Sequence, residues 1–136
     1  MSAFNPFTGQ WSYRSFRNDP DLGVEPNDLL FGAGNLVLEE TAPGIVSGTL
    51  GGQGWALKLQ GNASYGHPYT VRFQGTGEIG GETWVYDYLG FLSPHWPNGV
   101  GQRSAIVGTI VRTVPHSGGQ ATAGYVASWI AVRQGD

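Results

Sequence analysis

The stretch Glu82–Ser93, which reads ETWVYDYLGFLS, places one carboxylic acid among aromatic rings. Asp87 lies between Tyr86 and Tyr88, and all three are side chains that can transfer protons. A carboxyl group that faces a buried interior has a raised pKa and can act as a general acid or base, whereas one that faces water is an ordinary surface acid. If the chain is an enzyme, Asp87, Tyr86 and Tyr88 are the expected catalytic residues.

Aromatic side chains supply most of the other candidate site residues. Such rings commonly fill a core, but each buried Trp or Tyr needs a hydrogen-bond partner, and Leu or Ile would fill a dry core better. Rings with a few polar groups are typical of small-ligand pockets. Arg72 is expected near Asp87 or Tyr88, where it would pair with the acid or orient a ligand carboxylate or carbonyl, unless it is solvated outside the fold. The expected ligand-binding residues are Trp55, Arg72, Trp84, Tyr86, Tyr88, Tyr125 and Trp129.

Other kinds of site lack the residues they need. The chain has no cysteine and three histidines. His116 is expected at one end of the fold and His67 and His95 at the other, so no three-histidine metal site is expected. The sequence also contains no phosphate-binding loop, no His-Glu-x-x-His motif and no nucleophile elbow. We therefore expect no metal and no cofactor.

The aromatic stretch Glu82–Ser93 has the composition and spacing of a β-strand. Aromatic and β-branched residues dominate it. Side chains alternate between the two faces of a strand, so Trp84, Tyr86 and Tyr88 share one face and Asp87 lies on the other. Bulky residues on both faces predict a strand in the middle of a sheet, forming one wall of a ligand cavity.

The whole chain, residues 1–136, is expected to form a single all-β domain. Its 23 Gly and 8 Pro follow no repeat, which is typical of short strands joined by turns. The predicted strands are Gly9–Arg17, Leu36–Glu40, Ile45–Leu50, Trp55–Gln60, Tyr69–Gly75, Glu82–Ser93, Ser104–Thr113 and Tyr125–Arg133. Joined in order, eight antiparallel strands can close into an up-and-down β-barrel that holds one small ligand. A two-sheet sandwich is the alternative.

The loops of an up-and-down barrel alternate between its two ends. One end would receive the long loops Asn18–Asn35 and Val114–Gly124 together with two tight hairpins, and we expect the mouth of the barrel there. A single helical turn is expected around Asn27–Phe31, capped by Asn27 or Asp28. The same parity places the start of the first strand and the end of the last strand at the opposite end.

The beginning and the end of the chain carry residues that resemble a known superfamily. Gly9-x-Trp11 opens the first strand and Arg133 closes the last, which resembles the calycins, the superfamily of lipocalins and avidins. In lipocalins the first-strand Trp plugs the closed end of the barrel, and an Arg from the last strand lies across it. The resemblance implies a calycin-like barrel in which Trp11 and Arg133 form the structural plug through a cation–π contact.

Part of the resemblance is to avidins in particular. Ser47–Thr49, together with the Gly9–Trp11 opening, is similar to the beginning of an avidin. Avidins carry a biotin-binding Asn two positions after the Trp, and Tyr13 stands there in this chain, so biotin is not the expected ligand. Avidin-like barrels also associate through their outer faces. A homo-oligomer is therefore possible here, through the outward set Val107, Val111, Ala127 and Trp129.

Composition and charge limit the classes of partner that we expect. The net charge of −3 gives no positive field for nucleic acid or an anionic membrane. No apolar run approaches the ~18 residues of a membrane-spanning helix, and the N-terminus does not resemble a secretion signal. The absence of cysteine fits the reducing cytoplasm. We expect a soluble cytoplasmic protein with no nucleic-acid or membrane partner.

Three functions remain open from the residues and the resemblance together. The first is a binding barrel that holds a small hydrophobic or aromatic molecule in an internal cavity lined by rings. The second is a barrel enzyme of the cyclase or isomerase type in the same cavity, using Tyr, Asp and Arg groups, since calycin-like barrels include such enzymes. The third is a carbohydrate-binding surface around Trp96 in the Pro-rich loop.

Overall fold

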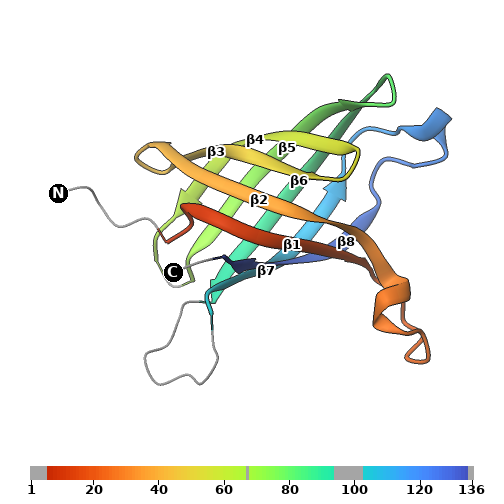
Figure 1. The fold of residues 1–136 in the computed structure, drawn as a ribbon, viewed down its shortest axis with the longest axis horizontal. Coiled ribbons are helices and arrows are strands. Elements are labelled where there is room, and N and C mark those ends of the chain that lie inside the picture. The colour runs from red at the N-terminus through yellow and green to blue at the C-terminus, as the bar shows by residue number, and fades with distance from the viewer. Residues whose placement is uncertain (1–5, 67, 94–102, 135–136) are drawn as a thin grey trace.

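Eight antiparallel strands close into a barrel in chain order, as Figure 1 shows. The computed structural model describes residues 6–66, 68–93 and 103–134. The strands are β1 (Gly9–Arg17), β2 (Leu30–Ala42), β3 (Ile45–Gly52), β4 (Trp55–Ser64), β5 (Thr70–Ile79), β6 (Glu82–Ser93), β7 (Ala105–Arg112) and β8 (Val126–Arg133). Because β8 pairs back with β1, the sheet has no open edge. The predicted up-and-down barrel is confirmed, and the sandwich alternative is wrong.

The second strand is much longer than its sequence predicts. The prediction starts it at Leu36 and assigns the residues before it to a loop, but β2 begins at Leu30. Its glycines suggested a loop, yet Gly32 and Gly34 pair with β1. A Cβ on Gly34 would lie 2.1 Å from a backbone oxygen of β3, so the close approach of these strands requires glycine there.

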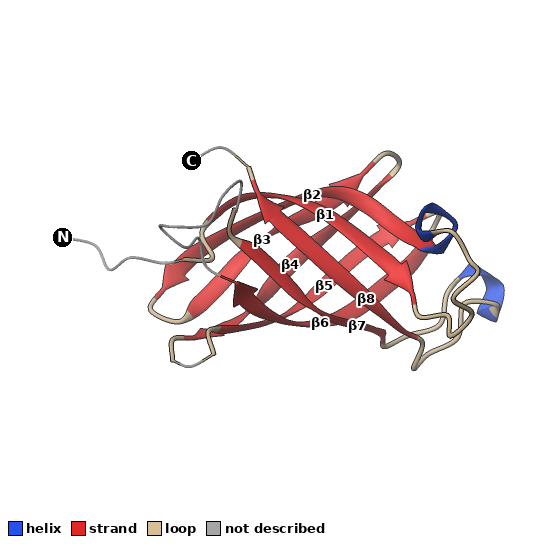
Figure 2. Cartoon of the chain, turned by 90° about the horizontal axis from the view of Figure 1, so that it is seen from below, coloured by secondary structure: helices blue, strands red, loops and turns tan. Residues whose placement is uncertain are grey.

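The connections at one end of the barrel contain the only short helices in the described part of the chain (Figure 2). The 3-10 helix η1 (Pro26–Leu29) overlaps the helical turn predicted around Asn27–Phe31, but Leu30 and Phe31 belong to β2. Its N-cap is Glu25 and no side chain caps it, so the prediction of capping by Asn27 or Asp28 is wrong. The second, η2 (Ser117–Gly119), lies in the connection between β7 and β8. No helix in the described ranges is long and apolar enough to cross a membrane.

A tryptophan plugs the other end of the barrel. Trp11 is completely buried, and its Nε1 donates a hydrogen bond to the Phe7 carbonyl at 3.0 Å. The Arg133 guanidinium carbon lies 4.4 Å from the centre of the Trp11 ring, which confirms the predicted cation–π contact. Arg133 also donates to the backbone carbonyls of Thr8, at 2.8 Å, and Pro6. These contacts tie the segment before β1 across the closed end.

The outer face of β6, β7 and β8 carries a row of apolar side chains. Phe91 pairs with Val107, which pairs in turn with Ile130, and all three are exposed. The predicted outward set is wrong in part, because Ala127 and Trp129 are buried inside the barrel. The alternation of β8 places them on the inner face. Association of copies through this outer face stays a prediction.

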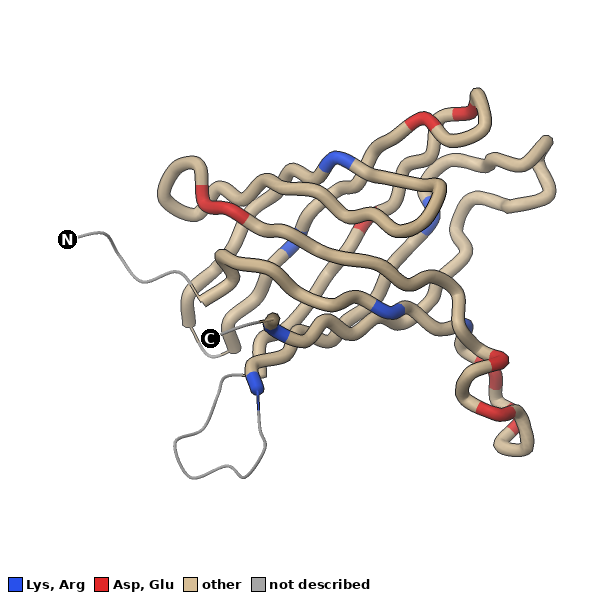
Figure 3. Tube along the Cα trace, in the orientation of Figure 1, with Lys and Arg blue, Asp and Glu red and all other residues tan. Residues whose placement is uncertain are grey.

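Most charged residues lie on the outer face of the barrel or on its connections. Figure 3 shows acidic residues on the connections at the helical end, in the β1–β2 connection and around the β5–β6 turn. Asp19, Asp21 and Asp28 are exposed in the first, and Glu78 and Glu82 are exposed at the second. The interior of the barrel receives aromatic and aliphatic side chains instead, together with a few polar groups that define the site below.

Candidate ligand-binding cavity

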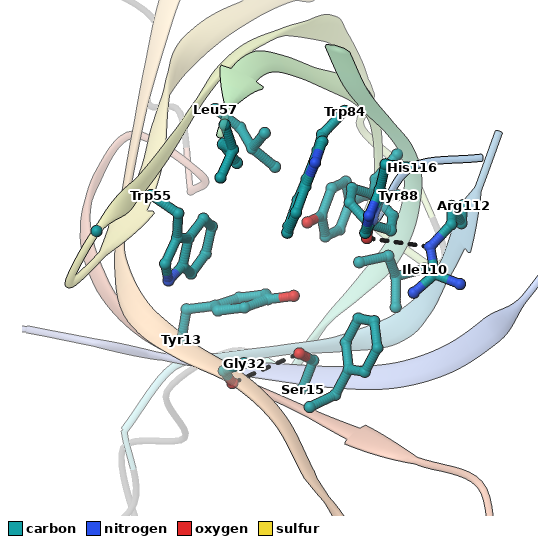
Figure 4. A pocket seen from close by; sticks show the side chains of 14 residues that line it. Tyr13, Ser15, Gly32, Trp55, Leu57, Trp84, Tyr88, Ile110, Arg112 and His116 are labelled. Carbon is teal, nitrogen blue, oxygen red and sulfur yellow. Dashed lines mark hydrogen bonds between the residues drawn. The ribbon is translucent and has the colours of Figure 1, made fainter. Parts of the chain in front are cut away.

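A cavity of about 370 Å³ lies inside the barrel at the end that carries the two short helices. This is the predicted mouth end, because its wall includes residues from the β3–β4 turn and from the β7–β8 connection. Figure 4 shows the lining side chains converging on an open centre. The aromatic residues that line it are Tyr13, Phe31, Trp55, Trp84, Tyr86 and Tyr88.

The floor of the cavity is a tightly packed aromatic cluster. Tyr88 stacks on Phe73 with ring centres 4.9 Å apart, and Trp129 meets both of them edge-on. The Trp129 Nε1 donates hydrogen bonds to the backbone oxygens of Leu89 and Thr109 at 3.2 and 3.0 Å. Trp129 therefore lies beneath the cavity and separates it from the closed end of the barrel.

One side of the cavity is polar. The register between β6 and β7 places Tyr86 directly opposite Arg112. The Arg112 Nε donates a hydrogen bond to the Tyr86 hydroxyl at 3.2 Å, drawn dashed in Figure 4. The same hydroxyl lies 2.8 Å from Nε2 of His116. Arginine, tyrosine and histidine thus form one buried chain along the wall.

The hydrogen bonds fix one direction in this chain. Arginine can only donate, so the Tyr86 oxygen accepts from Arg112. One arrangement that fits the other bonds has Tyr86 donating to Nε2 of a neutral His116, whose Nδ1–H donates to the Ser117 hydroxyl 2.9 Å away. The Tyr86 hydroxyl and both ring nitrogens of His116 then have partners, whereas Arg112 keeps further N–H groups.

The same residues hold the β7–β8 connection against the barrel. The His116 ring stacks on Trp84 with centres 3.7 Å apart and planes 8° from parallel. The exposed Glu82 carboxylate accepts backbone hydrogen bonds from Ser117 at 3.0 Å and Gly118 at 3.2 Å. These contacts join the start of β6 to η2 and complete the wall at the mouth.

Burial changes the pKa of three groups at the cavity. It lowers the pKa of His116, and the positive charge of Arg112 lowers it further, while Glu82 acts in the opposite direction. Burial raises the pKa of Tyr88 well above 10 and also raises that of Tyr13. Both phenols therefore stay protonated near neutral pH, and His116 stays neutral.

The lowered pKa of His116 predicts a loss of stability in mild acid. The unfolded chain takes up a proton at this histidine near its ordinary pKa of about 6.5, before the folded protein does. The contribution of His116 is therefore complete above this pH and is lost as the pH falls through the lowered folded value. Urea unfolding between about pH 8 and pH 5 measures it. The variant His116→Gln should show a smaller loss over this range, and an equal loss in both proteins would contradict the assignment.

Four of the predicted ligand-binding residues line the cavity, namely Trp55, Trp84, Tyr86 and Tyr88. Trp129 lies below them. Tyr125 is partly buried beside the cavity, where it stacks on Phe31 and lies 4.9 Å below the guanidinium carbon of Arg112. Whether any of these residues binds a ligand stays a prediction.

Two predicted site residues point away from the cavity. Arg72 and Asp87 are both exposed on the outer face of the barrel. The expected pair between them is also wrong, because Arg72 lies opposite Leu89, and Asp87 accepts a hydrogen bond from the Gln74 side chain at 2.9 Å. The alternation of each strand decides this, since Asp87 lies between two inward tyrosines. Asp87 therefore has no place in chemistry inside the cavity.

The sequence prediction missed the groups that make the cavity polar. Arg112 is not among the predicted site residues, but it is 7% exposed and lines the cavity. A signal was available, because Ile106 and Ile110 precede it at period two and are also buried. His116 was placed at the correct end, yet nothing in the sequence connected it to Tyr86, because its position depends on the conformation of the loop.

No group of three or more potential metal ligands occurs within the described ranges. His67, His95 and Trp96 lie outside the residues that the structure describes, so the predictions about them stay open. Among the described residues, the one buried side-chain polar atom without a hydrogen-bond partner is Nε1 of Trp84, in the cavity wall. A water molecule or a ligand can supply the hydrogen-bond acceptor that this N–H group lacks.

Comparison with known proteins found no matching family model, no matching curated protein and no matching solved structure. The closed eight-stranded barrel is compatible with a calycin-like fold. The function must therefore be argued from the cavity itself.

Proposed function

We propose that the protein binds a small, mostly hydrophobic or aromatic molecule inside the mouth of the barrel. The observation that carries this proposal is an aromatic-lined cavity of about 370 Å³ above a barrel end plugged by Trp11. Small-ligand sites commonly have volumes of about 300–1,000 Å³ and apolar walls with a few polar groups. The cavity has this composition, with Arg112, Tyr86 and His116 on one side.

The packing around the cavity supports binding without a large rearrangement. Trp129 is held by its two hydrogen bonds and Tyr88 by its stack on Phe73, so the floor has defined positions. His116 is held by Tyr86 on the polar side. A site whose walls are already ordered loses less conformational entropy when a ligand enters.

Filling the cavity with a side chain should abolish binding and leave the fold intact. A Cβ on Gly32 would lie 3.3 Å from the Ser15 hydroxyl and 4.0 Å from the Trp55 ring, at the cavity wall. The variant Gly32→Leu should therefore occupy the space that a ligand needs. Tryptophan fluorescence during titration with mono- and bicyclic aromatic compounds measures binding, and we expect at least about a tenfold loss of affinity.

The neighbouring position provides a matched control for this variant. Ala33 lies on the same strand and is exposed on the outer face, so Ala33→Leu adds an aliphatic side chain outside the barrel. It should bind as the unmodified protein does. Equal binding by Gly32→Leu, or no binding of any aromatic compound by the unmodified protein, would contradict the proposal.

An enzyme in the same cavity is the second candidate. It is favoured by the Tyr86–His116 hydrogen bond, which connects a phenol to a neutral imidazole beside a fixed positive charge. Its acid–base groups would be Tyr86 and His116, with Tyr88 as a proton donor only. Its substrate must enter the same cavity, so unchanged binding in Gly32→Leu would count against both candidates.

A further inference from the structure

The wall of the cavity contains a buried positive charge that no acidic residue in the described part of the chain neutralises. Arg112 is 7% exposed and lines the cavity. Its hydrogen bonds go to neutral groups, the Tyr86 hydroxyl and the backbone oxygen of Thr122. Within the described ranges no carboxylate forms an ion pair with it. A buried guanidinium without a counter-charge is unfavourable, because removal from water is not compensated by an opposite charge.

The rings around Arg112 hold it in place. Its guanidinium carbon lies 4.9 Å from the centre of the Tyr125 ring and 5.7 Å from that of Phe31. Cation–π contacts of this kind orient the flat guanidinium but do not cancel its charge. The group is therefore fixed at the edge of an apolar cavity with its charge unpaired.

Arg112 retains donors for a ligand after its two described hydrogen bonds are made. These use Nε and one Nη1 proton, so the remaining N–H groups are on the Nη atoms. Two N–H groups of a guanidinium match the two oxygens of a carboxylate. The Trp84 indole N–H, in the same wall, also lacks an acceptor. Unpaired donors without a nearby acceptor favour a ligand that carries oxygen atoms.

The acidic residues near the mouth do not supply the missing charge. The acids on the β1–β2 connection and at the β5–β6 turn, whose positions along the chain Figure 3 marks, are exposed to solvent. Glu82 uses its carboxylate to hold the backbone of η2. Salt screens exposed charges over about 8 Å at physiological ionic strength, whereas a buried charge is screened much less. At contact distance, Arg112 therefore dominates for a ligand inside the cavity.

We propose that the natural ligand is an aromatic carboxylate, whose ring lies among the tryptophans and tyrosines and whose carboxylate pairs with Arg112. This inference rests on the proposed function and names its ligand class. The ligand carboxylate then supplies the negative charge that the described residues do not place beside Arg112. A cationic ligand is disfavoured in the same cavity, because it would be placed beside Arg112.

The test compares 2-naphthoate with 2-naphthamide, which has nearly the same shape and no charge. Tryptophan fluorescence or calorimetry gives the affinity of each for the unmodified protein near neutral pH. We expect the carboxylate to bind about 10- to 100-fold more tightly than the amide, as a charge-assisted pair in a buried site implies. Gly32→Leu should lose the binding of both, which places the site in the cavity.

A pair of arginine variants assigns the preference to Arg112. Arg112→Met removes the charge and keeps much of the side-chain length, and the preference for the carboxylate should disappear. Arg72→Met removes an exposed arginine from the outer face of the same barrel, and the preference should remain. A preference that survives Arg112→Met would overturn the proposal. If Arg112→Met does not fold, the comparison of the two compounds on the unmodified protein still decides it.

The possible outcomes separate the two proposals. Equal affinity for naphthoate and naphthamide, both lost in Gly32→Leu, would overturn the carboxylate proposal and leave the binding function standing. Binding of naphthoate that persists in Gly32→Leu would also overturn it, because the compound would then bind elsewhere. No binding of these or any other aromatic compounds would overturn the binding function, and the ligand class with it.

Discussion

Replacement of Trp11 by alanine is expected to lower the free energy of unfolding by about 3–5 kcal/mol, the cost of truncating a large buried aromatic residue. Trp11 has no exposed surface, donates a hydrogen bond to Phe7 and lies under the Arg133 guanidinium. Its removal opens a cavity at the closed end and leaves Arg133 without its ring. Domains of this size are stable by only ~5–15 kcal/mol. Urea unfolding followed by circular dichroism measures the loss.

A second tryptophan provides the control for this experiment. Trp55 is partly buried and borders the cavity at the mouth, which is already open. Because its ring is already partly exposed, whereas Trp11 has no exposed surface, Trp55→Ala should cost clearly less stability than Trp11→Ala, although it should weaken ligand binding. Similar losses of stability in the two variants would show that Trp11 does not act as a plug.

Replacement of Gly90 by valine is expected to destabilise the barrel by about 3 kcal/mol, near the upper end of the usual cost of overpacking a core. A Cβ at this position would lie 2.6 Å from Cγ2 of Ile106 and 2.7 Å from Cζ2 of Trp129. The indole cannot move away easily, because its Nε1 is bonded to Leu89 and Thr109. Thermal or urea unfolding measures the effect.

The same substitution should also change the cavity. Trp129 packs beneath Tyr13 and Tyr88, with ring centres 6.0 and 5.7 Å away, so a displaced indole pushes on the floor. Gly90→Val should therefore weaken the binding of aromatic compounds as well as the fold. Gly66→Ala is the control, because no atom of the described residues, its chain neighbours aside, lies within 4 Å of the added Cβ. If Gly90→Val is as stable as Gly66→Ala, then Gly90 is not needed to accommodate Trp129.

The sequence by itself determined the architecture and the two ends of the barrel. Period-two alternation groups Trp84, Tyr86 and Tyr88 on one face of β6, and the parity of an up-and-down chain brings Trp11 and Arg133 to one end and the long connections to the other. These results depend on local patterns and on connectivity. Neither requires the strand registers to be known.

The alternation of a strand leaves open which of its faces is the inner one. For β5 and β6, alternation separated Arg72 and Asp87 from the neighbouring inward rings, and applying it strictly would have excluded both from the site. For β8 the sequence allowed either face, and the structure placed Trp129 inside. Both faces of β8 carry apolar side chains, since Val126 and Ile130 are exposed, so hydrophobicity alone did not distinguish them.

Only the tertiary structure brought Arg112, Tyr86 and His116 together. Arg112 meets Tyr86 because the β6–β7 register places them opposite each other, and no local pattern determines that register. His116 reaches the same hydroxyl because its ring stacks on Trp84 while Glu82 holds the backbone of η2. Residues far apart in the chain acquire a common site only when the sheet closes. The unpaired charge of Arg112, from which the ligand class is inferred, is therefore a property of the closed barrel and cannot be read from any single strand.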